Sequence, residues 1–203
     1  MISVYNLKPR FQQMLRPFLD FLVKRRFTPN VITLLALIGS ISVGAVIWLT
    51  RGQTGWLLIL PVWLFLRMAF NAIDGMMARQ YNMGTPLGCV LNELGDVLSD
   101  LAIYLPLGFV APESFTMVIL FAMGAVLTEF CGVLGYALAV KRHFEGPMGK
   151  SDRAFLVGVL SLATVFWDGV KMYWSWVFLI ALFLTVWTCV NRINGILKET
   201  KEV

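Results

Sequence analysis

The feature that most constrains this chain is a succession of apolar runs, each of a length suited to a membrane-spanning helix. About 20 helical residues cover the roughly 30 Å hydrocarbon core of a bilayer. With 58% hydrophobic residues and a mean hydropathy of +0.74, the composition argues against a water-soluble globule. The predicted spans are residues 31–50, 56–73, 87–110, 115–140, 153–167 and 173–197.

A different pattern precedes the first span. Apolar residues recur there at spacings of three and four with basic residues between them, which is typical of a helix lying in the membrane interface. Thr28-Pro29-Asn30 then ends this helix, and Pro29 suits the first turn of the next one. We therefore predict an all-α integral membrane protein: a cytoplasmic-side amphipathic lead-in over residues 1–29, then a domain of six transmembrane helices over residues 30–203. The apolar positions are Leu7, Phe11, Leu15, Phe18 and Leu22.

The basic residues predict the orientation of these helices. Lys and Arg gather before the first span, after the fourth span and in the C-terminal tail, whereas the opposite loops hold only Arg51 and Lys171. By the positive-inside rule, both termini face the cytoplasm, and we expect a bacterial inner (plasma) membrane. The basic isoelectric point then reflects topology and contact with anionic membrane lipids, with no nucleic acid as partner.

Ionisable and amide side chains concentrate between residues 71 and 100, inside two predicted spans. Such groups are costly within a membrane, so this stretch is the candidate functional site. At 100° per residue, Arg67, Asn71 and Asp74 fall on one stripe of the second span. Asn92, Asp96 and Asp100 recur at four-residue steps in the third span, and Glu93 lies beside them. A short turn between the spans predicts that Asn71, Asp74, Asn92 and Asp96 converge, as oxygen ligands suited to Mg²⁺ or Mn²⁺.

A second group of charged residues is expected deeper in the membrane than the residues of the candidate site. Arg67 lies about 10 Å deeper than Asp74, and Asp100 about 12 Å deeper than Asn92, at 1.5 Å per residue. Because buried charges need partners, we predict an Arg67–Asp100 ion pair, with Glu129 as an alternative partner for Arg67.

The spacing Asn71-x2-Asp74-Gly75-x2-Ala78-Arg79-x8-Gly88-x3-Asn92-x3-Asp96 resembles the signature of the CDP-alcohol phosphatidyltransferases. The resemblance extends to the six spans and the interfacial lead-in. It implies that a CDP-linked lipid, usually CDP-diacylglycerol, binds at the cytoplasmic face and reacts with an alcohol hydroxyl to release CMP. It also implies a homodimer. The acceptor alcohol is not identified by the sequence.

The resemblance implies a role for each matching residue. Asp96 takes the proton of the alcohol as the catalytic base. Divalent metal is held by Asp74 and Asp96 and at the positions of Asn71 and Asn92. Gly75, Ala78, Arg79 and Gly88 match the part of the signature that contacts the cytidine nucleotide.

This chain departs from the signature at two of its four acidic positions, which are Asn71 and Asn92. Each amide removes one negative charge from the metal site. Three outcomes are open: one metal is kept, nearby acids such as Glu93 or Glu129 compensate, or turnover is lost. A further basic pair, Lys150 and Arg153, is either a phosphate contact or an ordinary cytoplasmic loop feature.

Three functions therefore compete. The first is a phospholipid-synthesis enzyme that uses a CDP-linked lipid. The second is a lipid-binding or partner-binding protein of the same fold without turnover, which the two asparagines favour. The third is a small transporter of ions or solutes. In a transporter the acidic residues are expected near the membrane midplane, whereas here they cluster at the predicted cytoplasmic end.

Overall fold

The computed structural model describes residues 8–138 and 141–200, and these form helices joined by short connections. The principal helices are α1 (Lys8–Lys24), α2 (Pro29–Leu49), α3 (Ile59–Gln80), α4 (Pro86–Tyr104), α5 (Phe115–Leu138), α6 (Lys150–Phe166) and α7 (Trp174–Glu199). Short 3₁₀ segments join them: η2 (Thr54–Leu58), η3 (Leu105–Phe109), η4 (Pro112–Ser114) and η5 (Asp168–Tyr173). The predicted all-α architecture is confirmed.

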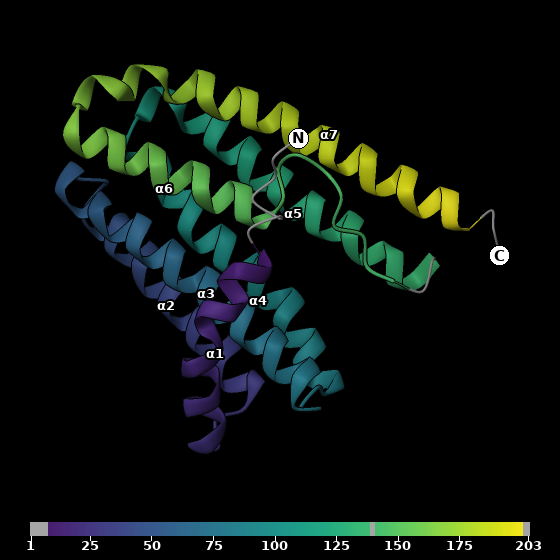
Figure 1. The fold of residues 1–203 in the computed structure, drawn as a ribbon. Helices are drawn as coiled ribbons and strands as arrows, with labels where there is room; N and C mark the ends of the chain where they lie inside the picture. The colour runs from purple at the N-terminus through teal and green to yellow at the C-terminus, as the bar shows by residue number, and fades with distance from the viewer. Residues whose placement is uncertain (1–7, 139–140, 201–203) are drawn as a thin grey trace.

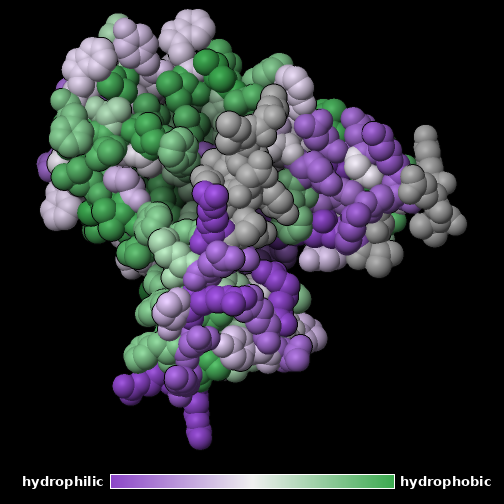
Figure 2. Space-filling view, viewed as in Figure 1, coloured by the Kyte–Doolittle hydropathy of each residue, from purple (hydrophilic) through white to green (hydrophobic). Residues whose placement is uncertain are grey.

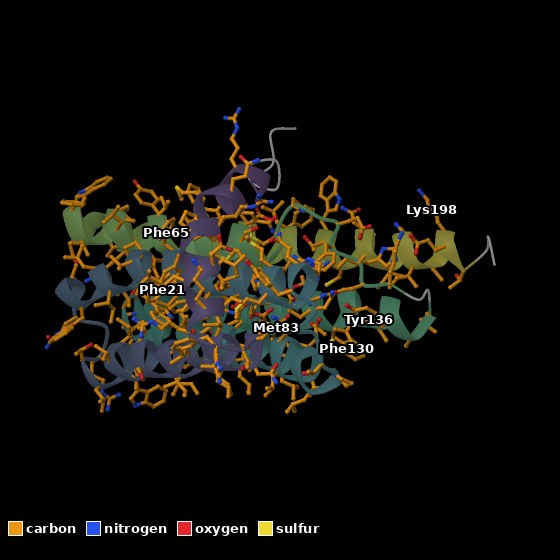
Figure 3. All side chains as sticks on the ribbon, turned by 60° about the horizontal axis from the view of Figure 1, so that its bottom comes forward. Phe21, Phe65, Met83, Phe130, Tyr136 and Lys198 are labelled. Atoms are coloured by element: carbon orange, nitrogen blue, oxygen red, sulfur yellow. The ribbon has the colours of Figure 1, made fainter. Side chains whose placement is uncertain are left out.

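The predicted lead-in forms α1, which crosses the other helices at a steep angle (Figures 1 and 3). Its Leu19 and Leu22 are buried against Ile73 and Met77 of α3, whereas Phe18 remains exposed. Leu7, the first residue of the predicted apolar pattern, lies outside the described residues. A helix with one face on the bundle and apolar side chains left exposed fits a position in the membrane interface.

Helix α2 begins where the sequence predicts. Thr28 is its N-cap and accepts a hydrogen bond from the Val31 amide at 3.4 Å, and Pro29 occupies the first turn. The same arrangement starts α4, where Thr85 accepts from the Gly88 amide at 2.9 Å.

Some predicted boundaries differ from the observed ones. Helix α3 continues to Gln80, beyond the predicted end at residue 73, so Asp74 and Arg79 belong to the same helix as Arg67. Helix α4 ends at Tyr104 and passes into η3, because Pro106 has no backbone N–H with which to continue the α-helix. Helix α6 begins at Lys150, earlier than residue 153. Residues 139 and 140, the predicted end of the fourth span, lie outside the described residues.

Four stretches of the described chain are long and apolar enough to cross a membrane: Pro29–Leu49, Thr54–Gln80, Pro112–Leu138 and Asp168–Glu199. Helix α4 carries the charged stripe, and α6 has only 17 residues. The four long stretches are therefore supported by length and composition, and the count of six remains a prediction.

The apolar core lies at the end of the bundle where α3 and α7 begin and α4 ends. Tyr104, Phe121 and Phe178 pack there as tilted ring pairs, with ring centroids 5.2 Å and 5.1 Å apart, and Trp174 is fully buried beside them. Helices α5 and α7 run side by side (Figure 1). The polar residues of α3 and α4 lie toward the other ends of these helices.

The surface divides in the same way. Hydrophilic residues gather over α1 and around the far end of α7, while much of the remaining face is hydrophobic (Figure 2). Phe65 and Phe130 are exposed apolar side chains, and Tyr136 of α5 and Lys198 of α7 lie toward the hydrophilic end (Figure 3). A broad exposed apolar surface of this kind is expected of a protein whose solvent is lipid.

Candidate active site between α3 and α4

The polar stripes of α3 and α4 face each other, as predicted. Asn71 Nδ2 donates to Asp96 Oδ1 at 3.5 Å, and Asn92 Nδ2 donates to Asp74 Oδ2 at 3.4 Å. Asp74 and Asp96 are each only 4% exposed. Four side chains from two helices thus meet, the carboxylates buried and the amides half-buried, with an amide next to each carboxylate.

Helix α2 contributes a residue that the sequence analysis missed. Thr33 Oγ1 donates to Asp74 Oδ2 at 2.8 Å and also contacts the Pro29 carbonyl at 3.1 Å. Thr33 lies on the first turns of α2, just after the Thr28-Pro29-Asn30 break. A hydroxyl within an apolar span was a signal available in the sequence, but its partner depends on how α2 packs against α3.

Asp74 has one oxygen without a partner. Its Oδ2 atom accepts from Thr33 and Asn92, whereas the buried Oδ1 atom has no hydrogen-bond partner among the described residues. A buried carboxylate oxygen left in this state is costly unless a cation or a water completes it. Within the described part of the chain, no group of three or more His, Cys, Asp or Glu is arranged to hold a metal ion.

Asp96 is fully engaged by protein groups. Its Oδ2 atom accepts a hydrogen bond from the Lys150 ammonium, and its Oδ1 atom lies 3.7 Å from Arg67 Nη2. Arg67 Nη2 also donates to the Asp96 carbonyl at 3.1 Å. From the sequence, Lys150 was either a phosphate contact or an ordinary loop residue, and its contact with the proposed base was not predicted.

The predicted deeper ion pair is confirmed. Arg67 Nη1 donates to Asp100 Oδ1 at 2.5 Å, and both side chains are nearly inaccessible. Glu129, the alternative partner proposed for Arg67, pairs instead with Arg153 at 2.6 Å and with Arg142. Each of these buried charges therefore has an opposite charge beside it, as burial requires.

Arg153 is wholly buried within this network. Its guanidinium donates to Asp100 Oδ2 from Nε and Nη2, and Nη1 donates to Thr128 Oγ1 at 2.8 Å and to the Met148 carbonyl at 3.1 Å. The structure thus places Arg153 deeper than Lys150, with protein partners on all three of its nitrogens.

Glu93 lies beside the site, on the α5 side. Its Oε1 atom accepts from Arg142, and its Oε2 atom is buried without a hydrogen-bond partner among the described residues. Arg142 joins Glu93 to Glu129. The charge of Glu93 is therefore shared with an arginine from the loop before α6.

That loop positions Lys150. His143 is buried with its ring between Glu145 and Glu199, and the Met148 amide donates to Thr188 Oγ1 at 3.0 Å. At the start of α6, the Asp152 side chain accepts a hydrogen bond from the backbone amide of the N-cap residue Gly149 at 3.0 Å. The sequence pattern assigned His143 no partner; Glu145 lies two residues away in the same loop, whereas Glu199 reaches the ring only because the loop folds onto α7.

The predicted nucleotide-contacting residues lie on the C-terminal part of α3 and the first turn of α4. Arg79 is exposed and folds back along its helix, so that a Cβ built on Gly75 would lie 3.2 Å from Arg79 Nη2. Gly88 approaches α2 closely, since a Cβ there would lie 2.6 Å from Asn30 Oδ1. Ala78 is half-buried on the same helix as Gly75. Small residues at these positions leave backbone and a guanidinium accessible to an anionic ligand.

Comparisons with known proteins agree with this arrangement. Residues 26–187 match the family model described as CDP-alcohol phosphatidyltransferase. The chain is 42% identical over 202 residues to inner membrane protein YnbA of Escherichia coli, covering 100% of both chains. It is 33% identical over 95 residues to a phosphatidylinositol phosphate synthase of Streptomyces avermitilis, a match that covers 46% of this chain and 37% of that one.

Solved structures with the same fold include the phosphatidylinositol phosphate synthase of Mycobacterium tuberculosis. Its crystal structure with CDP-DAG bound has a TM-score of 0.74 at 20% identity, covering 91% of this chain and 94% of that chain. Its complex with manganese and citrate has a TM-score of 0.73 at 20% identity and covers 89% and 87%. At this identity the likeness concerns the fold. The family model and the full-length relative together show that this chain belongs to the CDP-alcohol phosphatidyltransferase family.

Proposed function

We propose that this protein transfers the phosphatidyl group of a CDP-linked lipid, such as CDP-diacylglycerol, to an alcohol hydroxyl and releases CMP in phospholipid biosynthesis. The observation that carries the proposal is the convergence of Asn71, Asp74, Asn92 and Asp96 between α3 and α4. Membership of the family supports the reaction class. The CDP-DAG found in a structure with the same fold supports the choice of donor.

The donor atoms of the site fit a divalent cation, Mg²⁺ or Mn²⁺. Asp74, whose carboxylate lies beside Asn92, has a buried Oδ1 atom with no hydrogen-bond partner in the described ranges, and carboxylate and amide oxygens are the ligands such hard cations prefer. Asn71, Asp74, Asn92 and Asp96 are the proposed ligands, with Glu93 at the edge of the set. When bound, the cation neutralises charge on the diphosphate and helps to orient it.

The side chains of this chain supply the remaining steps. Asp96 accepts the proton of the acceptor hydroxyl, and the hydroxyl oxygen then attacks the phosphorus that carries the lipid. The bond from that phosphorus to the CMP oxygen breaks, and CMP leaves. Lys150 and Asn71 hold the Asp96 carboxylate in position from two sides.

The nucleotide half of the donor is assigned to the cytoplasmic end of the site. Gly75, Ala78, Arg79 and Gly88 are the proposed contacts, with the Arg79 guanidinium directed at phosphate oxygens. Because Lys150 lies next to Asp96, its ammonium is also a proposed contact for a phosphate bound at the site. Arg153 is better suited to holding α6 against Asp100 and Glu129, because its nitrogens all have protein partners.

The proposal includes an orientation and an assembly. Six helices, α2 to α7, form the membrane domain of residues 30–203, and both termini and the site face the cytoplasm. The basic residues near the ends of α1, α6 and α7 support this orientation. A homodimer is proposed from the family resemblance.

The test is CMP release by the purified full-length protein in detergent or lipid nanodiscs. CDP-diacylglycerol is supplied with Mg²⁺ or Mn²⁺ and a panel of alcohols, beside Asp96→Ala. Metal-dependent CMP release that disappears in Asp96→Ala is the expected result, and the accepted alcohol names the product. Release that survives Asp96→Ala would remove Asp96 from its assigned role.

A second function is favoured by one observation. The amides of Asn71 and Asn92 each donate a hydrogen bond to one oxygen of the neighbouring carboxylate, which is compatible with a protein that binds the lipid donor without turning it over. Saturable donor binding without CMP release, for every metal and alcohol tried, would favour this function over the transferase.

A further inference from the structure

The two carboxylates of the site are not equivalent. Asp96 has both oxygens engaged, by Lys150 at Oδ2 and by Asn71 and Arg67 at Oδ1. Asp74 has one engaged oxygen and one buried oxygen without a partner in the described chain. The open coordination position therefore lies on the Asp74 side.

The two asparagines reduce the electrostatic repulsion that a second cation would otherwise have to offset. Two carboxylates at these separations would repel each other unless a cation lay between them. Here Asn71 and Asn92 each donate an N–H to the carboxylate they face, at 3.5 Å and 3.4 Å. Each amide thus gives its carboxylate one hydrogen bond from nitrogen, and neither amide oxygen accepts a hydrogen bond from the described residues, so both oxygens can ligate a cation.

Neighbouring acids do not restore the missing charge. Glu129 is paired with Arg142 and Arg153, and Glu93 is paired with Arg142. The charge left at the site is that of Asp74 and Asp96, and Lys150 offsets part of it. The charge of one divalent cation already exceeds the net negative charge that remains. A second cation would be repelled by the positive charges of Lys150 and Arg67.

We propose that the site binds a single divalent cation at Asp74, and that the Lys150 ammonium takes the place of a second cation at Asp96. This inference rests on the function proposed above. It resolves the question raised by Asn71 and Asn92: the chain keeps one metal, and a fixed positive charge replaces the other.

The experiment counts bound Mn²⁺ in the purified full-length protein by equilibrium dialysis and records its electron paramagnetic resonance spectrum. The wild-type protein is expected to bind one Mn²⁺ per chain, with the resolved hyperfine pattern of an isolated ion. Asp74→Asn is expected to abolish this binding, whereas Glu113→Gln, at an exposed carboxylate just before α5, is expected to keep one ion.

Restoring the acids provides the converse test. Asn71→Asp combined with Asn92→Asp is expected to admit a second Mn²⁺, which would couple magnetically with the first at the separation of about 3.5–4 Å usual in two-metal sites. Adding Lys150→Met should tighten the second site by roughly tenfold or more, the scale on which one neighbouring charge shifts a proton equilibrium. Asn194→Asp on the exposed end of α7 is the matched control and should still bind one ion.

Two coupled ions in the wild-type protein, or none at millimolar Mn²⁺, would overturn the inference whether or not the variants fold. An ion that persists in Asp74→Asn but is lost in Asp96→Asn would also overturn it. Thermal unfolding of each variant establishes that it is folded. CMP release measured in parallel separates the two proposals: one ion without turnover keeps this inference and removes the transferase, whereas two ions with turnover do the reverse.

Discussion

Arg153 on the first turn of α6 donates to the same oxygen of Asp100 twice, from Nε at 3.1 Å and from Nη2 at 2.9 Å. This contact ties α6 to α4 at the depth where Arg67 ties α3 to α4. The helices that carry the site are thus joined just beneath it by buried charge. The same guanidinium reaches Glu129 of α5, so four helices meet at one network.

Arg153→Met is predicted to destabilise the protein strongly. Removing one partner leaves Asp100 and Glu129 with less compensation in a buried environment, which costs about 3–5 kcal/mol in the free energy of unfolding. For a chain of this size the melting temperature should fall by roughly 10 °C, measured by thermal unfolding in detergent.

Lys171→Met is the control for that change. Lys171 pairs with Asp168 at 2.6 Å near the surface, where an ion pair contributes under about 1 kcal/mol. Similar losses in the two variants would show that the buried network is not what holds α6 in place.

Asp96→Asn is predicted to lower kcat for CMP release by about 10²–10⁴-fold, the usual contribution of a general base. The amide keeps the size of the side chain, so folding should be retained while proton acceptance is lost. Asp168→Asn, at an exposed carboxylate, should leave kcat unchanged. Equal activity of Asp96→Asn and wild type in the CMP assay would argue for another base.

Gly75→Ala is predicted to weaken donor binding without loss of stability. The new Cβ would lie 3.2 Å from Arg79 Nη2, so the guanidinium must move from its place above the helix. Loss of one charge-assisted hydrogen bond to phosphate should raise KM for the CDP-linked lipid by roughly tenfold, equivalent to about 1.4 kcal/mol. Gly55→Ala, where a Cβ meets nothing within 4 Å, is the matched control and should leave KM unchanged.

Gly44→Ala is predicted to disrupt the packing of α2 on α4. A Cβ at Gly44 would lie 1.9 Å from the Ala102 carbonyl oxygen, a backbone atom that cannot turn aside. Overpacking of this kind costs about 1–3 kcal/mol or more, which thermal unfolding would detect.

Gly95→Ala tests the same helix pair from the other side. Its Cβ would meet Thr33 Cγ2 at 3.6 Å, an ordinary contact, and alanine favours the helix by about 1 kcal/mol. The two variants should therefore change the melting temperature in opposite directions. A neutral Gly44→Ala would show that α2 and α4 are farther apart than described.

Several features followed from the periodicity of single helices and from the matched depth of residues on neighbouring ones. The four-residue steps from Asn92 to Asp100 and the stripe from Arg67 to Asp74 depend only on helical periodicity, and the Arg67–Asp100 pair followed from matched depth. Pro29 and Thr28 marked the start of α2 for the same local reason. The sequence therefore determined the helical class, the two helices of the site and the side chains that face each other across them.

Other contacts depended on segments far apart in the chain. Thr33 meets Asp74 across 41 residues, and Lys150 meets Asp96 across 54. Every buried charge needs a partner, and each buried arginine had more than one acid as a possible partner. The packing of α5 and α6 against α4 decides which acid each arginine pairs with. Only the tertiary structure decided that Glu129 pairs with Arg153 and that Lys150 reaches the proposed base. It also decided that Asp74 has an oxygen without a partner in the described chain. The physical reason is that these contacts depend on how several helices pack together, and the periodicity of one helix does not determine its distance from another.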